Sequence, residues 1–145
     1  MTHERTRNLT PYIKLSAAII ALTSVAACDA PTPAPQGPLA EQLAGSRLTL
    51  RENAPDANPD DVMILELAGT GRGVMTVEPM ILTFDWSVPQ DGVFCMENLR
   101  LAGILSDDDA LDCARVEISG NRINLDWPDD SPEGRRSARG TISPL

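Results

Sequence analysis

The chain has 145 residues, of which 42% are hydrophobic and only 3% aromatic, and its formal net charge at pH 7 is -9. This length has room for one ordinary domain. An acidic surface is repelled by phosphate backbones, so the charge argues against nucleic acid as a partner.

Residues 1–27 contain the three parts of an export signal in the expected order. Arg5, Arg7 and Lys14 make the first part basic, and the run 15–27 carries no charge. A membrane-spanning helix needs about 20 apolar residues, so this run is too short for a permanent span. We therefore expect a signal helix that is removed from the mature protein.

The apolar run ends in Val25-Ala26-Ala27-Cys28. This motif resembles the lipobox of bacterial lipoproteins. The resemblance implies that the Cys28 thiol receives a diacylglycerol, that the chain is cut before Cys28, and that the new amino terminus is acylated as well, as with palmitate. Two or more acyl chains anchor a protein stably. We expect a lipid-anchored envelope protein that faces the periplasm.

The choice between the inner and the outer membrane stays open. Asp29 directly follows the cysteine and resembles the signal that retains lipoproteins of enteric bacteria in the inner membrane, a rule that does not hold in all bacteria.

A proline-rich linker is predicted to follow the lipidated cysteine, over residues 28–38. Four prolines occur in the ten residues 29–38, and such a stretch favours an extended spacer of up to about 30 Å. Loss of residues 1–27 removes one acidic and three basic residues, so the formal net charge changes from -9 to -11.

Residues 39–145 are predicted to form an all-β domain in the extracytoplasmic space. Leu39 to Ala44 follows Pro38 and precedes Gly45, an arrangement typical of one short helical turn. Short β-rich runs then recur between turn residues, which indicates a small antiparallel meander that forms a barrel or sandwich of about eight short strands. The runs are 47–51, 62–68, 73–77, 80–88, 93–98, 114–119, 122–127 and 138–142.

The clearest local feature is a hairpin with Gly120-Asn121 as a two-residue turn. This turn fixes the register, because a slip of one residue would move every side chain to the other face. One face is then apolar, with Ile118 opposite Ile123, Val116 opposite Leu125 and Ala114 opposite Trp127. The other face is polar, with Arg115 opposite Asp126 and Glu117 opposite Asn124.

A second hairpin is predicted around the three-residue loop 90–92, which ends in glycine. It would pair Val88 with Phe94 and Trp86 with Met96. Cys95 and Cys113 then project away from the apolar faces of their hairpins. With Cys28 consumed by lipid, they are an even pair in an oxidising compartment, so we expect a disulfide that ties the two hairpins together. The loop-entropy estimate for this bond is about 3 kcal/mol.

Few residues suggest chemistry. Histidine and lysine occur once each, at His3 and Lys14, both inside the predicted leader. The mature chain then lacks Ser-His and Cys-His nucleophilic sites, histidine metal sites and lysine Schiff bases. We expect no enzyme activity, no catalytic residues and no cofactor.

Three further segments resemble ligand-binding motifs but have simpler interpretations. The glycines of 69–73 are followed by a strand-like run and not by the helix that a phosphate loop needs, which favours a hairpin connection. The segment 56–61 begins like a calcium loop but lacks the glycine and glutamate of an EF-hand, which favours an acidic surface turn.

The densest acidic cluster of the chain consists of Asp107, Asp108, Asp109 and Asp112. A solvated loop is the simplest interpretation, and weak calcium binding or contact with a basic partner stays open.

From Leu43 onward the chain resembles lipocalin-like small envelope proteins of bacteria. The resemblance rests on Leu43-Ala44-Gly45 before the first strand, a meander with Trp86 in one strand, and a late pair of cysteines. Our first hypothesis is a noncatalytic envelope lipoprotein whose β-domain binds a protein partner or supports an envelope complex. The alternatives are a lipocalin-like carrier of a small apolar ligand and an inhibitor of an exported enzyme.

Overall fold

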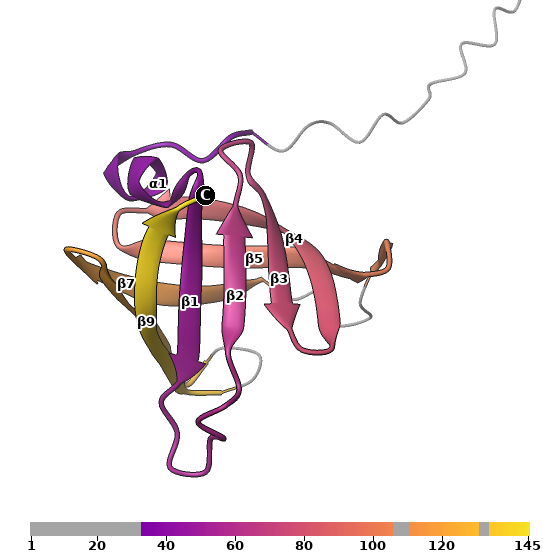
Figure 1. Ribbon diagram of the computed structural model, residues 1–145. Helices are drawn as coiled ribbons and strands as arrows, with labels where there is room; N and C mark the ends of the chain where they lie inside the picture. The colour runs from indigo at the N-terminus through magenta and orange to yellow at the C-terminus, as the bar shows by residue number, and fades with distance from the viewer. Residues whose placement is uncertain (1–32, 106–110, 131–133) are drawn as a thin grey trace, which may run out of the picture. The chain divides into compact units, whose positions relative to one another are not determined.

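The computed structural model describes residues 33–105, 111–130 and 134–145 (Figure 1). The predicted signal segment 1–27, Cys28, Asp29 and Asp107 to Asp109 lie outside these residues. One short helix is followed by nine strands in the described part of the chain. The elements are α1 (Pro38–Leu43), β1 (Ser46–Glu52), β2 (Met63–Leu67), β3 (Arg72–Val77), β4 (Met80–Gln90), β5 (Val93–Leu101), β6 (Ile104–Leu105), β7 (Asp112–Ser119), β8 (Arg122–Trp127) and β9 (Arg136–Pro144).

The strands form a closed antiparallel barrel. Neighbours follow the order β4-β3-β2-β1-β9-β8-β7-β5-β6, and a further pairing of β4 with β5 closes the ring. Eight strands make up this ring, and β6 is an additional short strand at the edge of β5. Figure 1 shows the last strand, β9, beside the first, β1, and the two strands pair antiparallel. The predicted all-β barrel is confirmed, although β6 was not predicted.

The helix α1 lies where the sequence predicts, although it begins and ends one residue earlier than the expected 39–44. Pro38 lies in the first turn of the helix. N–H groups there have no acceptor within the helix, so the missing N–H of proline costs no hydrogen bond. Leu39, Ala40 and Leu43 are buried against the barrel. The Ser46 hydroxyl donates a 2.6 Å hydrogen bond to the Leu43 carbonyl, which satisfies an acceptor at the end of the helix.

The hairpin of β7 and β8 has the predicted register. Ile118 pairs with Ile123, Val116 with Leu125, Arg115 with Asp126 and Glu117 with Asn124. At its far end, Ala114 pairs with Phe94 of β5 and Trp127 with Arg136 of β9. All of the predicted apolar residues of this hairpin are in the core or pack against it.

The hairpin of β4 and β5 is correct in its inner part and wrong at its turn. Trp86 pairs with Met96 as predicted, and Ser87 pairs with Cys95. The register then shifts, Gln90 pairs with Val93, and the turn has two residues where three were predicted. Val88 and Pro89 therefore form a β-bulge opposite Phe94, a position that suits Pro89 because proline has no N–H to donate to the ladder.

The glycine-rich segment 69–73 joins β2 to β3, as the hairpin interpretation predicts. Gly73 pairs with Phe84 of β4, and a Cβ atom at position 73 would lie 2.3 Å from the Phe84 ring. The missing side chain leaves room for this ring in the core. The role of Gly73 is therefore packing, with no connection to phosphate binding.

Candidate functional site

The interior of the barrel is filled by apolar side chains. Six strand residues have no surface that a water-sized sphere can touch: Leu48, Leu50, Leu65, Leu67, Phe84 and Phe94. Leu39, Ala40 and Leu43 of α1 add to the same core. Side chains this tightly surrounded line no ligand-sized space. A site is therefore to be sought on the outer surface.

One outer region is apolar. We call Met80, Ile81, Leu101, Ile104 and Leu105 the apolar rim. All five are exposed, and Ile104, at 74% of its full surface, is the most exposed of them. The register brings them to the same end of three neighbouring strands, because Leu82 of β4 pairs with Leu101 of β5 and Leu101 pairs with Ile104 of β6. Since side chains alternate between the two faces of a sheet, Ile81 and Leu105 project from the face opposite to Leu101.

The strand β6 gives this rim an open edge. It pairs with β5 through Arg100 to Leu105 and Leu101 to Ile104, and no other strand pairs with it in the described residues. An edge strand leaves backbone N–H and C=O groups unpaired, and natural proteins usually protect such edges with charge or proline. The two residues of β6 are instead isoleucine and leucine.

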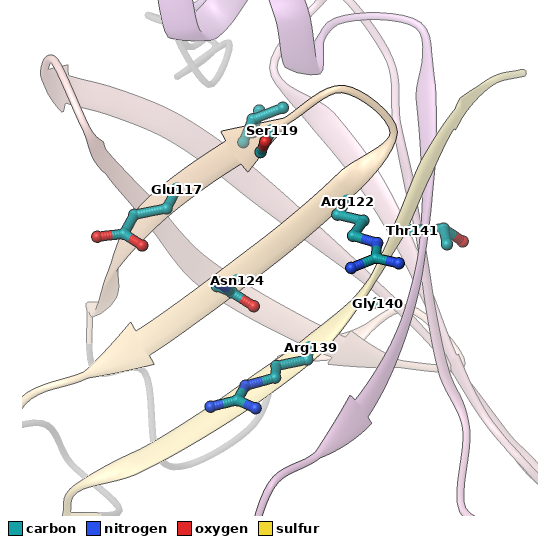
Figure 2. Close-up of a pocket in the computed structure, with 8 residues that line it drawn as sticks. Glu117, Ser119, Arg122, Asn124, Arg139, Gly140 and Thr141 are labelled. Atoms are coloured by element: carbon teal, nitrogen blue, oxygen red, sulfur yellow. The ribbon is translucent and has the colours of Figure 1, made fainter.

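A second outer region is concave and is lined mainly by polar and charged residues, which Figure 2 labels. It is a groove of about 760 Å³ on the outer face of β7, β8 and β9. Figure 2 shows the side chains of Glu117, Arg122, Asn124 and Arg139 spread over these three strands. We call this region the arginine groove. Its lining residues are Glu117, Ile118, Ser119, Arg122, Asn124, Arg139, Gly140 and Thr141.

The arginine groove continues onto β1. Arg51 of β1 pairs with Arg139 of β9, and both side chains are exposed on the outer face. Four ion pairs occur among the described residues, and none of them includes Arg51, Arg122 or Arg139. Three guanidinium groups of an acidic protein are thus gathered without a carboxylate partner. Guanidinium groups bind carboxylate and phosphate groups through paired hydrogen bonds.

Two of the four described ion pairs share one buried carboxylate, away from the arginine groove. The buried carboxylate of Asp85 accepts a 2.9 Å hydrogen bond from Asn98 and lies 3.2 Å from Arg72 and 3.5 Å from Arg100. All three partners of Asp85 are hydrogen-bond donors, and they come from β3 and β5. The cluster therefore holds these two strands to β4.

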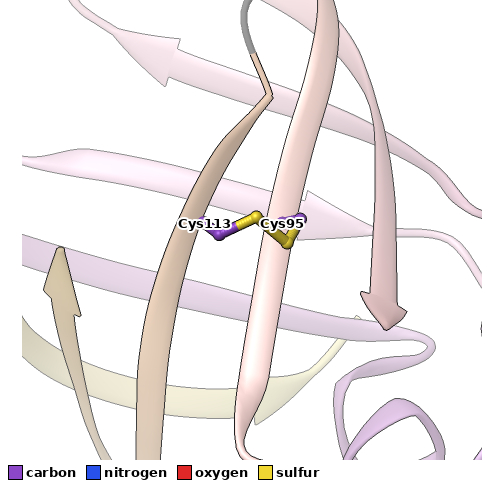
Figure 3. The surroundings of a disulfide bond; sticks show 2 residues. All are labelled: Cys95 and Cys113. Carbon is purple, nitrogen blue, oxygen red and sulfur yellow. A yellow bond between two sulfur atoms is a disulfide. The ribbon is translucent and has the colours of Figure 1, made fainter. Parts of the chain in front are cut away.

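The predicted disulfide is present (Figure 3). Cys95 of β5 and Cys113 of β7 are direct partners in the ladder, so the bond joins the two hairpins as expected. Cys95 lies outside the apolar core cluster but is itself buried.

The predicted acidic cluster is described only at Asp112. Its carboxylate accepts a hydrogen bond from Arg136, whose guanidinium carbon lies 4.5 Å above the Trp127 ring. The segment 56–61 is an exposed turn, as expected. Among the described residues, no three acidic, histidine or cysteine side chains gather closely enough to hold a metal ion.

The sequence did not reveal either outer region. The turn at Gly120-Asn121 places Arg122 and Asn124 on the outer face, but the pairing of β9 with β1 and β8 joins segments far apart in the chain. The exposure of Ile104 and Leu105 was equally hidden, because a two-residue strand has no periodic pattern.

Comparison of the chain with protein-family models, curated proteins and solved structures finds no match. Within residues 33–105, 111–130 and 134–145, no helix is both long and apolar enough to span a membrane.

Proposed function

We propose that this protein is a noncatalytic lipoprotein of the bacterial envelope whose β-barrel binds a protein partner through the apolar rim. The observation that carries the proposal is the gathering of exposed apolar side chains at one end of β4, β5 and β6, namely Met80, Ile81, Leu101, Ile104 and Leu105. Contiguous exposed apolar residues next to a polar surface are typical of protein interaction sites.

The position of the rim at an open strand edge supports a polypeptide partner. A strand of the partner placed beside β6 would pair with the backbone groups that no other described strand uses, while Ile104 and Leu105 supply apolar contacts. A small apolar ligand would leave these backbone groups unpaired. The rim therefore favours a protein over a small molecule.

Substitution of rim residues tests this proposal. The full lipidated protein is crosslinked in detergent-solubilised envelope, purified, and the yield of crosslinked partner is measured for Ile104→Ser and Ile81→Ser. Leu145→Ser is the matched control, because Leu145 is 60% exposed at the C-terminus and lies outside the rim. The rim variants should lose most of the crosslinked partner, and the control should retain it.

Two results would contradict the proposal. One is an equal yield from all three variants, and the other is a wild-type protein that crosslinks to nothing. Ile81 belongs to β4 and not to β6, so its variant stays informative if Ile104→Ser disturbs the pairing of β6.

The membrane anchor is part of the same proposal and rests on Val25-Ala26-Ala27-Cys28. Intact mass spectrometry of the mature protein should give a chain that starts at Cys28 and carries the mass of its acyl chains. Cys28→Ser should release the protein from the membrane fraction. An uncleaved chain, or an unmodified Cys28, would contradict the anchor and leave the partner proposal standing.

Inhibition of an exported enzyme is the second candidate. The loop between β1 and β2 extends away from the barrel (Figure 1), and hydrogen bonds hold it in place. The Asn58 side chain accepts from the Asp60 N–H and donates to Asp61, and the Asn53 N–H donates to the Ser137 carbonyl at 2.8 Å. A projecting loop that is already ordered loses little entropy on binding. Activity assays of the crosslinked partner, with and without this protein, would separate an inhibitor from a structural partner.

The carrier alternative has the least support. It needs an open apolar interior, but six inward side chains of the strands have no accessible surface: Leu48, Leu50, Leu65, Leu67, Phe84 and Phe94. Mass spectrometry of the purified protein under native conditions would reveal a retained ligand.

A further inference from the structure

We infer that the arginine groove is a recognition site for a short polypeptide segment that carries acidic residues at one end and a basic residue at the other. This site goes beyond the proposed function, since the groove lies on β7, β8 and β9 next to β1, and the apolar rim belongs to β4, β5 and β6. Each surface can therefore be tested without the other.

The first argument is the order of charges across the sheet. Glu117 of β7 pairs with Asn124 of β8, Asn124 pairs with Arg139 of β9, and Arg139 pairs with Arg51 of β1. The row therefore runs from a carboxylate, through an amide, to two guanidinium groups. Arg122 lies two residues from Asn124 along β8, on the same face and opposite Thr141, and adds a third positive charge near Arg139.

The second argument is the electrostatic repulsion between the arginine side chains of this surface. Like charges directly opposite each other on neighbouring strands destabilise a sheet. The chain has 21 acidic residues against 12 basic ones, yet no described ion pair supplies Arg51, Arg122 or Arg139 with a carboxylate. An external carboxylate would turn this repulsion into attraction. The groove is thus complementary to an anion from outside the chain.

The third argument selects a polypeptide over a polyanion. Repulsion by an acidic protein acts on every charge of a long polyphosphate, and Glu117 repels it inside the groove itself. A segment with few charges is repelled much less, because salt at physiological concentration screens the attraction or repulsion between exposed charges beyond about 8 Å. Ser119, Asn124 and Thr141 also offer hydrogen-bonding groups for peptide backbone.

The row also sets the spacing of the segment. Glu117 and Arg51 are three strand spacings apart, or about 14 Å at about 4.8 Å for each spacing. An extended chain advances about 3.3 Å per residue. An extended peptide of about six residues is therefore long enough to place a lysine over Glu117 and carboxylates over Arg139 and Arg51.

The blocked peptide Lys-Gly-Ser-Glu-Gly-Glu is the probe that follows from this spacing. Binding to the full lipidated protein in neutral detergent micelles is measured from the backbone amide chemical shifts of β1, β8 and β9. We expect saturable binding that weakens with added salt. Arg139→Ser should weaken it at least tenfold. Arg47→Ser is the matched control, since it removes the same charge from an outward position of β1 that is paired with Glu66, and it should change binding less than twofold.

Glu117→Gln distinguishes a polypeptide site from a simple anion site. It should weaken binding of the lysine-containing peptide several-fold and strengthen binding of tripolyphosphate. Arg139→Ser removes a like-charge contact and should leave the melting temperature unchanged or higher, so lost binding would not reflect unfolding.

Three outcomes overturn the inference. The peptide fails to bind the wild-type protein, Arg47→Ser weakens binding as much as Arg139→Ser, or tripolyphosphate binds more tightly than the peptide and loses its binding in Arg139→Ser. The last result would assign the groove to phosphate groups.

Discussion

Cys95 on β5 and Cys113 on β7 are paired directly across two adjacent strands and joined by a disulfide. The bond spans a sequence separation of 18 residues, a stretch that includes β6 and its exposed side chains. It restricts the unfolded chain and ties the two hairpins that were recognised from the sequence.

Removal of this disulfide should destabilise the barrel without changing its strands. The double variant Cys95→Ala with Cys113→Ala should lose about 3 kcal/mol of unfolding free energy, because the unfolded chain gains loop entropy. Urea unfolding followed by tryptophan fluorescence measures the loss, and reduction of the wild-type protein should produce the same shift. A loss below about 1 kcal/mol would mean that the bond adds little to a barrel already closed by hydrogen bonds.

The buried carboxylate of Asp85 should matter more for stability than the exposed ion pair of Glu66. Asp85 is 3% exposed and contacts Asn98, Arg72 and Arg100. Asp85→Asn removes the negative charge and replaces one acceptor oxygen by an NH2 donor that faces other donors, so it should cost about 1–3 kcal/mol. Glu66→Gln breaks the surface pair with Arg47 and should cost less than about 1 kcal/mol. Equal losses in chemical denaturation would show that burial does not govern these ion pairs.

The two tryptophans provide a matched comparison. Both are buried. The Trp86 indole N–H donates to the Ala68 carbonyl at 3.0 Å and to the Arg72 carbonyl at 3.1 Å, whereas the Trp127 indole N–H has no hydrogen-bond partner among the described residues. Substitution by phenylalanine leaves a similar void in each case. Trp86→Phe should therefore be more destabilising than Trp127→Phe by about 1 kcal/mol. The prediction fails if Trp127→Phe proves the more destabilising of the two in thermal or urea unfolding.

Gly140 allows the first and last strands to close the barrel. A Cβ atom at this position would lie 1.8 Å from the Thr49 carbonyl oxygen, so β9 would have to move away from β1. Gly140→Ala should cost at least about 1–3 kcal/mol, the usual range for overpacking. Gly69→Ala is the control, because its nearest neighbour would be the Ala44 side chain at an ordinary 3.7 Å. Similar melting temperatures for the two variants would contradict this role.

Much of the fold was predictable because its signals are local. Alternation places Val116, Leu125 and Ile123 on one face, and the Gly120-Asn121 turn sets their register without knowledge of the rest of the chain. The disulfide followed from two such hairpins and a count of cysteines. The bulge at Val88 and Pro89 was missed, since a register shift depends on how a strand curves around the barrel.

The two outer surfaces were hidden from the sequence for a different reason. The pairing of Arg51 with Arg139 joins positions 88 residues apart in the numbering and appears only when the barrel closes. Ile104 and Leu105 look like ordinary core residues in a sequence, and only their place at the edge of β5 exposes them. Residues 106–110, which follow them, lie outside the described part of the chain.

Binding of a protein partner at the apolar rim is the central claim, and a photocrosslinking amino acid in place of Ile104 tests it most directly. The lipidated full-length protein carrying this substitution is irradiated in intact cells, and the crosslinked product is compared with that of a protein substituted in the same way at Leu145. The account predicts one discrete protein crosslink from position 104 that is absent from position 145. No product from position 104, or the same products from both positions, would contradict it.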